Sequence, residues 1–179
     1  MVINNQTSSS AQHLPPDDLT RQLVIARPNE NNELSHIALV GDVYTILLHG
    51  KDTGGHYSLI DMHIPAGGGP GPHRHDFEEM FSVLEGAIEL TFRGSKVMVK
   101  AGETVNVPAN APHFFRNVAD RPARMLCMCT PPGQEDFFTN IGCAVGSRIG
   151  PAPELDEAAK KEQKEKIQAL APQYRTELL

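Results

Sequence analysis

The sequence has no tryptophan, only three cysteines and no long hydrophobic run. No window approaches the roughly 18 apolar residues that a membrane-spanning helix needs, and residues 1–12 lack the basic and apolar regions of a signal peptide. We interpret Cys127, Cys129 and Cys143 as core thiols, because their number is odd and the first two stand two apart in an apolar run. These absences predict a cytoplasmic protein.

Positive charge is also scarce. The 16 Lys and Arg residues are outnumbered by 22 Asp and Glu residues, which gives a net charge of −6, and they form no basic block. Proteins that bind nucleic acids or anionic membranes commonly carry such a block. We therefore expect a small molecule, and neither nucleic acid nor a membrane, as the partner.

The chain divides into three parts by composition. Residues 1–32 are rich in Ser, Asn, Gln and Pro and predict a polar N-terminal arm, disordered or lying on a neighbouring subunit. Residues 33–150 are rich in short β-forming runs. Residues 151–179 predict a C-terminal helix and tail, with acidic residues in the first turn and an end near Pro172. A chain of 179 residues fits one folded core.

The middle part predicts an all-β fold. Short β-rich runs alternate there with Gly, Pro, Asn and Asp, and no helical pattern separates them, which is typical of a β-sandwich or barrel. The connections contain hairpin signals such as Gly86 and Gly94-Ser95. The expected strands are 43–49, 56–64, 80–84, 87–93, 96–99, 104–107, 113–117 and 123–130.

Four residues indicate a metal site. They lie in two stretches, Gly67-x5-His73-x-His75-x3-Glu79-x6-Gly86 and Gly102-x5-Pro108-x-Asn110-x2-His113-x3-Asn117. Three imidazoles and a carboxylate suit one divalent transition metal (Fe, Mn, Co, Ni, Cu or Zn) better than Ca²⁺ or Mg²⁺. Residues two apart on a strand point to the same side, so His73 and His75 are able to face one interior.

The neighbouring residues leave alternatives. Glu78 competes with Glu79 as the carboxylate ligand, although the two-residue period favours Glu79, followed by Phe81 and Val83 in one inward row. Single histidines on a β-face are commonly structural, and we interpret His13, His36 and His49 in that way. The candidates for a substrate pocket are Phe81, Phe115, Phe137 and His63.

The two stretches resemble the paired signature motifs of the cupin superfamily over residues 67–117. Asn110 stands where the family usually has glycine, and Asn is the residue after Gly that best tolerates a positive φ. The Pro/Gly-rich run 65–72 and Thr130-Pro131-Pro132-Gly133 also resemble small single-domain cupins of the quercetin-dioxygenase-like group. The resemblance implies a double-stranded β-helix, or jelly-roll barrel, with the metal inside, and a homodimer.

The resemblance also implies an activity. Four protein ligands leave open positions on the metal for O₂ or a chelating substrate. We expect a dioxygenase acting on an aromatic or enolisable small molecule, with Glu79 also serving as catalytic proton acceptor. The alternatives are a metal-dependent isomerase or lyase of a small sugar or hydroxy acid, and a non-catalytic cupin that binds a small molecule.

Overall fold

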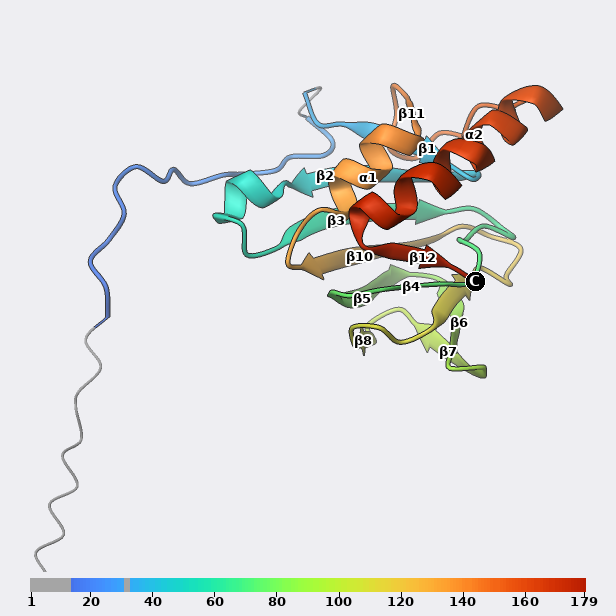
Figure 1. The fold of residues 1–179 in the computed structure, drawn as a ribbon, viewed down its shortest axis with the longest axis horizontal. Coiled ribbons are helices and arrows are strands. Elements are labelled where there is room, and N and C mark those ends of the chain that lie inside the picture. Colours follow the sequence, from blue (N-terminus) through green and yellow to red (C-terminus); the bar gives the residue numbers. More distant parts are fainter. Residues whose placement is uncertain (1–13, 31–32) are drawn as a thin grey trace, which may run out of the picture.

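The computed structural model describes residues 14–30 and 33–179. Two antiparallel β-sheets pack against each other (Figure 1). In spatial order, the seven-stranded sheet contains β11 (Cys143–Ala144), β1 (His36–Leu39), β2 (Asp42–Leu48), β3 (Ser58–Ile64), β10 (Ala123–Thr130), β5 (Glu78–Glu85) and β8 (Thr104–Val107). The five-stranded sheet contains β12 (Thr176–Leu178), β4 (His73–His75), β9 (His113–Arg116), β6 (Ala87–Phe92) and β7 (Ser95–Lys100). The predicted all-β jelly roll is confirmed.

The core lies between the two sheets. Ile60 and Met125 of one sheet and Ile88 and Phe115 of the other belong to the same buried cluster. Burial alternates along β10 and along β5 as far as Val83, where every second residue is buried, as the pleat of a strand with one inward face requires. That period sets which side chains reach the interior.

The cysteines divide between core and surface. Cys127 and Cys129 are fully buried on β10, which confirms their interpretation as core thiols. Cys143 is exposed, so the same interpretation is wrong for it. It lies on the two-residue strand β11 at the edge of its sheet, and both residues of that strand are exposed.

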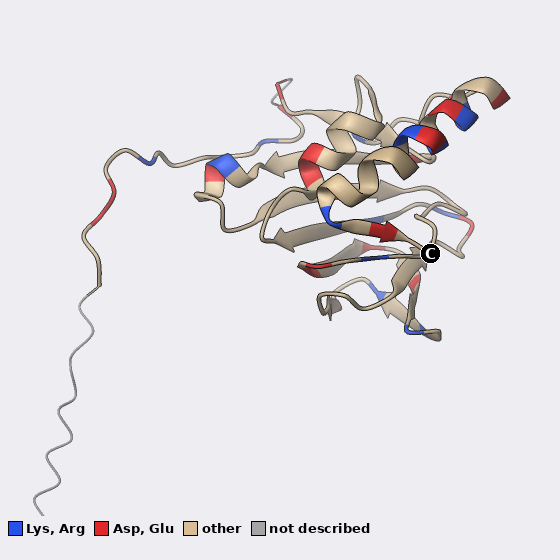
Figure 2. Ribbon diagram, viewed as in Figure 1, with Lys and Arg blue, Asp and Glu red and all other residues tan. Residues whose placement is uncertain are grey.

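Two helices lie side by side on one face of the molecule (Figure 1). α2 (Glu157–Leu170) confirms the predicted C-terminal helix; the Asp156 side chain caps it by accepting a 2.8 Å hydrogen bond from the N–H of Ala159. Its charged residues are lysines and glutamates interspersed along the helix (Figure 2). α1 (Gln134–Ile141) was not expected from the sequence. No helix in the described part of the chain is long and apolar enough to cross a membrane.

The C-terminal segment is more than a helix and tail. After α2 come the 3₁₀ turns of η2 (Ala171–Tyr174) and then β12, which pairs antiparallel with β4. Thr176 lies opposite His75, and Leu178 lies opposite His73. Part of the segment predicted to lie outside the barrel therefore forms an edge of the five-stranded sheet.

The predicted N-terminal arm lies only partly within the described residues. Residues 14–30 run in an extended path away from the sheets (Figure 1), and Leu14, Leu19 and Leu23 are exposed. The Arg21 guanidinium, near the middle of this segment, donates to the carbonyl of Asp52 in η1 (Gly50–Thr53), which holds this part of the segment on the barrel. The remainder of the predicted arm, residues 1–13 and 31–32, lies outside the described residues.

The Pro/Gly-rich loop 65–72 is anchored by a buried carboxylate. Asp42 has no exposed surface, and its two oxygens accept hydrogen bonds from the Gly69 N–H (3.2 Å) and the Tyr44 hydroxyl (3.0 Å). Burial raises the pKa of Asp42 to about 7, and the two hydrogen bonds offset only part of that effect. The loop leads directly into β4, so Asp42 links the barrel core to the strand that carries two histidines.

The raised pKa predicts a pH-dependent stability. The folded state binds the Asp42 proton more tightly than the unfolded chain does, so this stabilisation is complete below about pH 4 and is lost as the pH rises through about 7. Its full extent is on the order of 4 kcal/mol. We expect Asp42→Asn to remove most of this pH dependence, measured as urea unfolding free energies of variant and wild type from pH 5 to 8.5. The exposed Asp120→Asn is the control; identical pH profiles for all three proteins would contradict the assignment.

Candidate metal centre

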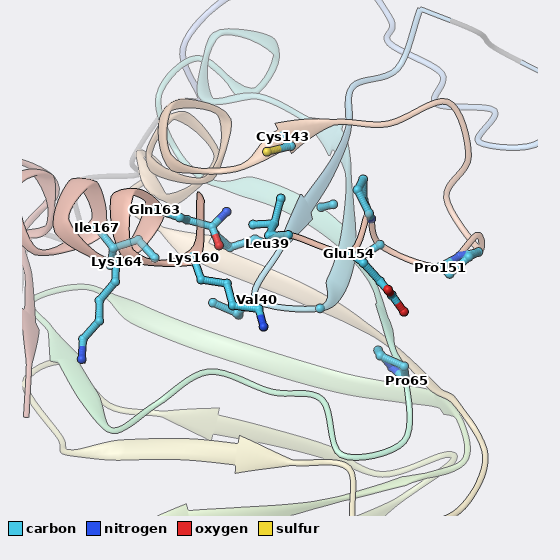
Figure 3. Close-up of a pocket in the computed structure, with 15 residues that line it drawn as sticks. Leu39, Val40, Pro65, Cys143, Pro151, Glu154, Lys160, Gln163, Lys164 and Ile167 are labelled. Atoms are coloured by element: carbon cyan, nitrogen blue, oxygen red, sulfur yellow. The ribbon is translucent and has the colours of Figure 1, made fainter. Parts of the chain in front are cut away.

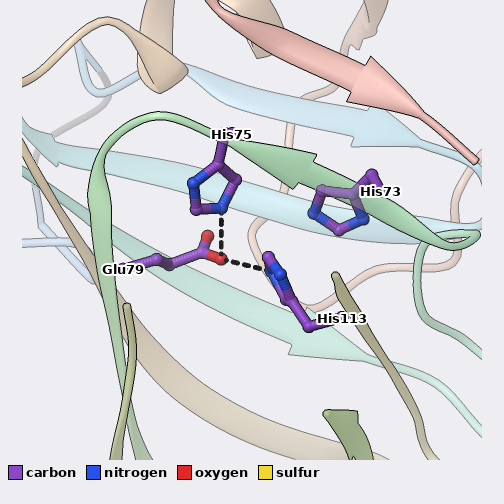
Figure 4. Close-up of side chains that lie close together, drawn as sticks. All are labelled: His73, His75, Glu79 and His113. Carbon is purple, nitrogen blue, oxygen red and sulfur yellow. Dashed lines mark hydrogen bonds and ion pairs between the residues drawn. The ribbon is translucent and has the colours of Figure 1, made fainter. Parts of the chain in front are cut away.

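The four predicted ligands come from both sheets. His73 and His75 lie on β4, and His113 is the first residue of β9; both strands belong to the five-stranded sheet. Glu79 lies on β5 in the seven-stranded sheet. Because the inward faces of the sheets oppose each other, the four side chains converge between them (Figure 4).

The cluster is compact and buried. One potential ligand atom from each of the four residues lies within 4.8 Å of the others. The exposed fractions are 8% for His73 and 3% or less for the other three residues. The Nε2 atoms of His75 and His113 lie 3.1 and 3.0 Å from Oε2 of Glu79. A divalent ion bound here would have four protein ligands and little competition from bulk water.

The orientation of each imidazole fits a metal. Every Nδ1 atom faces a backbone carbonyl oxygen two residues away, with distances of 2.8 Å for His73 to Gly71, 2.9 Å for His75 to Phe77 and 2.9 Å for His113 to Ala111. A carbonyl only accepts hydrogen bonds, so Nδ1 carries the proton and Nε2 is the atom left to bind a metal. Carbonyl partners of this kind accompany metal-bound histidines.

The electrostatics of the cluster favour a cation at its centre. Burial, and to a smaller extent the neighbouring His113, lowers the pKa of His73 to about 4, so His73 is neutral near pH 7. Burial opposes ionisation of Glu79, but hydrogen bonds with His113 and His75 outweigh it and hold the pKa of Glu79 below its ordinary value. Burial also opposes protonation of His113, yet Glu79 raises the pKa of that imidazole overall. A proton on His113 therefore occupies a position that a divalent metal ion would take.

The second oxygen of Glu79 faces the thiols. Cys127 Sγ donates to Oε1 of Glu79 at 3.2 Å, and Cys129 Sγ lies 3.6 Å from Cys127 Sγ. Burial raises the pKa of Cys127 well above its ordinary value, so its sulfur keeps the proton that it donates. Because the thiol is bonded to Oε1, the oxygen that faces the histidines is Oε2. Glu79 would therefore bind a metal ion through one oxygen.

Glu78 does not take part in the cluster. Its side chain accepts hydrogen bonds from Asn106 Nδ2 (2.7 Å) and the Ala109 N–H (3.2 Å) on the outer side of β5. The structure therefore resolves the choice between the two carboxylates in favour of Glu79, which joins the three histidines.

The turn before His113 depends on Asn110. This residue has a φ of 67°, and its N–H donates a 2.7 Å hydrogen bond to the carbonyl of His75. The left-handed conformation explains why Asn is tolerated where the resembling motif has Gly. The hydrogen bond also holds the turn on β4, so the strand that carries His113 is aligned with the strand that carries His75.

A cavity of about 480 Å³ opens beside the cluster. Its wall includes the metal-ligand candidates His73 and Glu79 and the predicted pocket residues Phe81, Phe115 and Phe137. His63 does not line this cavity. It lies on the opposite face of β3 from the lining residue Met62, so its inclusion in the predicted pocket is wrong. Strand register, which alternates side chains between the two faces, explains the error.

Sequence reasoning missed several lining residues. They are Tyr44, Met62, Gln134 at the start of α1, and Leu178 and Leu179 at the C-terminus. One signal was present for α1, since Pro131-Pro132-Gly133 precedes two acidic residues, Glu135 and Asp136, in a first turn. No local signal marks Leu178, because its position results from pairing with a distant strand.

A second, larger cavity of about 790 Å³ lies between α2, the β1–β2 turn and residues 151–155 (Figure 3). It contains none of the four metal-ligand candidates. Leu39, Val40, Lys164 and Ile167 line both cavities, so the two adjoin along α2.

Comparisons with known proteins agree with this architecture. A family model described as "Cupin domain" matches residues 60–129. An uncharacterized protein of Methanocaldococcus jannaschii is 32% identical over 99 residues, which cover 54% of this chain and 79% of that protein. The solved structure of the polyketide cyclase RemF from Streptomyces resistomycificus is 18% identical, with a TM-score of 0.53, and its match covers 83% of this chain and 99% of RemF. The chain belongs to the cupin superfamily.

A further relative has a named activity. Quercetin 2,3-dioxygenase of Bacillus subtilis is 31% identical over 115 residues, which are 63% of this chain but 34% of that longer protein. The aligned part thus spans about a third of the relative's length.

Proposed function

We propose that this protein is a metal-dependent dioxygenase acting on an aromatic or enolisable small molecule. The observation that carries the proposal is the placement of His73 and Glu79 in the wall of a cavity that is also lined by Phe81, Phe115 and Phe137. Its volume of about 480 Å³ lies in the range of small-molecule sites. The similarity to quercetin 2,3-dioxygenase supports the same reaction class.

The residues would hold one divalent transition metal per chain through His73, His75, Glu79 and His113. When bound, such an ion activates O₂ and lowers the pKa of a coordinated hydroxyl group. The aromatic side chains hold a flat substrate by apolar contact; Phe81 and Phe115 meet edge to face, with ring centroids 5.5 Å apart. Because these rings and Leu178 line the cavity, they also keep water from the reacting substrate.

Glu79 is the group proposed to receive a proton from the substrate. It lines the cavity, and its Oε1 atom is the oxygen that the imidazoles leave free. Cys127 holds Oε1 through its thiol hydrogen, so a proton arriving there would require that thiol to turn toward its neighbour Cys129. The 3.6 Å separation of the two sulfur atoms allows this change of partner.

Oxygen consumption tests the proposal. Protein loaded anaerobically with Fe, Mn, Co or Ni is mixed with flavonols or 1,3-diketones in an oxygen electrode, with the His73→Ala, His113→Ala double variant as control. We expect substrate-dependent O₂ uptake by at least one metal form of the wild type and none by the variant. Product formation without O₂ uptake would replace the proposal with an isomerase or lyase, and binding without turnover would replace it with a non-catalytic cupin.

We also propose that the protein is a cytoplasmic homodimer. The exposed Leu14, Leu19 and Leu23 of the extended arm support a subunit contact, because each has more than four fifths of its surface free. Light scattering coupled to gel filtration tests the subunit number, and a mass of one chain would contradict the homodimer.

A further inference from the structure

Gln134 is a buried polar residue in the cavity beside the metal-ligand cluster. It is the first residue of α1, has 4% of its surface exposed and lines the same cavity as His73 and Glu79. The other lining groups near it include the rings of Phe137 and Phe138 from the same helix. A polar amide is therefore placed in a largely apolar wall.

The Oε1 atom of the Gln134 amide is buried and has no hydrogen-bond partner among residues 14–30 and 33–179. The adjacent Glu135 differs: its two oxygens accept hydrogen bonds from the Gly50 N–H (2.9 Å) and the Gly133 N–H (2.8 Å). Because buried polar atoms in folded proteins nearly always have a partner, the isolated amide points to a ligand that supplies one.

We propose that Gln134 recognises the substrate, its amide oxygen accepting a hydrogen bond from a hydroxyl group on an aromatic ring. The apolar surfaces of Phe81, Phe115 and Phe137 suit the ring. Gln134, on the wall formed by α1, provides an amide oxygen that can accept a hydrogen bond from the hydroxyl group. The substrate class is then a hydroxylated aromatic molecule rather than an unsubstituted one. This inference rests on the proposed function, because it assigns the substrate to the cavity beside the metal-ligand cluster.

The discrimination arises from hydrogen bonding in a buried site. A ligand that lacks the hydroxyl group leaves the Gln134 oxygen without a partner, whereas a hydroxylated ligand satisfies it. Replacing Gln134 with leucine, which has a similar volume and no polar atom, removes the basis for that preference. The change also removes an unpartnered amide oxygen, so the folded state is expected to keep its thermal stability.

The test compares two probes on anaerobic, Co²⁺-loaded protein. Quercetin and 3-hydroxyflavone share one ring system and the 3-hydroxyl group, and differ in the additional hydroxyl groups of quercetin. Dissociation constants come from absorbance titrations of wild type, Gln134→Leu, Gln134→Met and the control Gln163→Leu. Gln163 lies on α2 and lines the other cavity (Figure 3).

We expect wild type and Gln163→Leu to bind quercetin more tightly than 3-hydroxyflavone, and both Gln134 variants to lose about tenfold of that preference. An unchanged affinity ratio in folded Gln134→Leu or Gln134→Met would overturn the inference alone. Failure of both probes to bind the wild type would overturn it together with the proposed substrate class. The oxygen-uptake experiment separates the two proposals, because probe discrimination without O₂ uptake would overturn the dioxygenase proposal and leave the role of Gln134 standing.

Discussion

Protein in which His73 and His113 are both replaced by alanine will purify without its transition metal, whereas the wild type will carry about one ion per chain. The double substitution removes two of four ligands and leaves His75 and Glu79, which cannot hold a divalent ion against cellular chelators. Elemental analysis of the purified proteins measures the metal content. His56→Ala is the matched control, because the His56 side chain is exposed and its backbone carbonyl, which accepts a hydrogen bond from the Thr130 hydroxyl, is kept in the variant.

The double variant must also be shown to fold. Replacing two buried imidazoles by alanine leaves space in the core and costs on the order of 2–5 kcal/mol per site, so far-ultraviolet circular dichroism and a thermal melt accompany the metal analysis. Equal metal content in the wild type and a folded double variant would contradict the assignment of the centre. Equal loss in His56→Ala would show that the purification, and not the ligand set, determines the metal content.

Gly69→Ala will destabilise the protein, and Gly71→Ala, two positions along the same loop, will not. Gly69 has a φ of 125°, and an added Cβ would overlap the carbonyl oxygen of Phe115 on β9. Gly71 has no atom within 4 Å of the position where its Cβ would lie. We expect a cost of about 2–4 kcal/mol for Gly69→Ala from backbone strain and steric overlap, and about 0.5 kcal/mol or less for Gly71→Ala.

Comparing the two variants separates the steric effect of an added methyl group from the loss of backbone freedom that accompanies any Gly→Ala substitution. Chemical unfolding of both variants gives the two free energies, and metal titration shows whether the displaced Phe115 backbone disturbs His113, which lies two residues away on the same strand. Similar stabilities for the two variants would show that the loop relaxes around the new methyl group. Weaker metal binding in Gly69→Ala alone would indicate that the loop also positions the ligands.

The strands and the four candidate metal ligands were accessible from the sequence because both depend on a period of two. Side chains two residues apart on a strand point to the same side. His73 and His75 on β4 are therefore buried together, and so are Glu79, Phe81 and Val83 on β5. Asn110 was interpretable because a positive φ restricts the residue types that fit, and its φ is 67°.

The remaining parts of the site depend on contacts that no local pattern encodes. β12 is three residues long, too short for a period to appear, and its partner β4 lies far away in the chain. α1 has eight residues and follows a proline pair, so its helical pattern extends for little more than two turns. His63 was assigned to the pocket without knowing which face of β3 turns inward; only the packing of Met62 against the core settles this.

The pairing of β12 with β4 has a consequence for how a bound ion would leave. Arg74 and Glu177 on the two strands lie 103 positions apart and are joined by a hydrogen bond of 2.7 Å between exposed side chains. Such a short edge strand opens by local fraying at a far lower cost than global unfolding. When β12 detaches, β4 loses one neighbour and the cavity loses the wall formed by Leu178. We therefore expect an ion bound at the cluster to exchange with solution through local opening of β12, at a rate separate from the stability of the barrel.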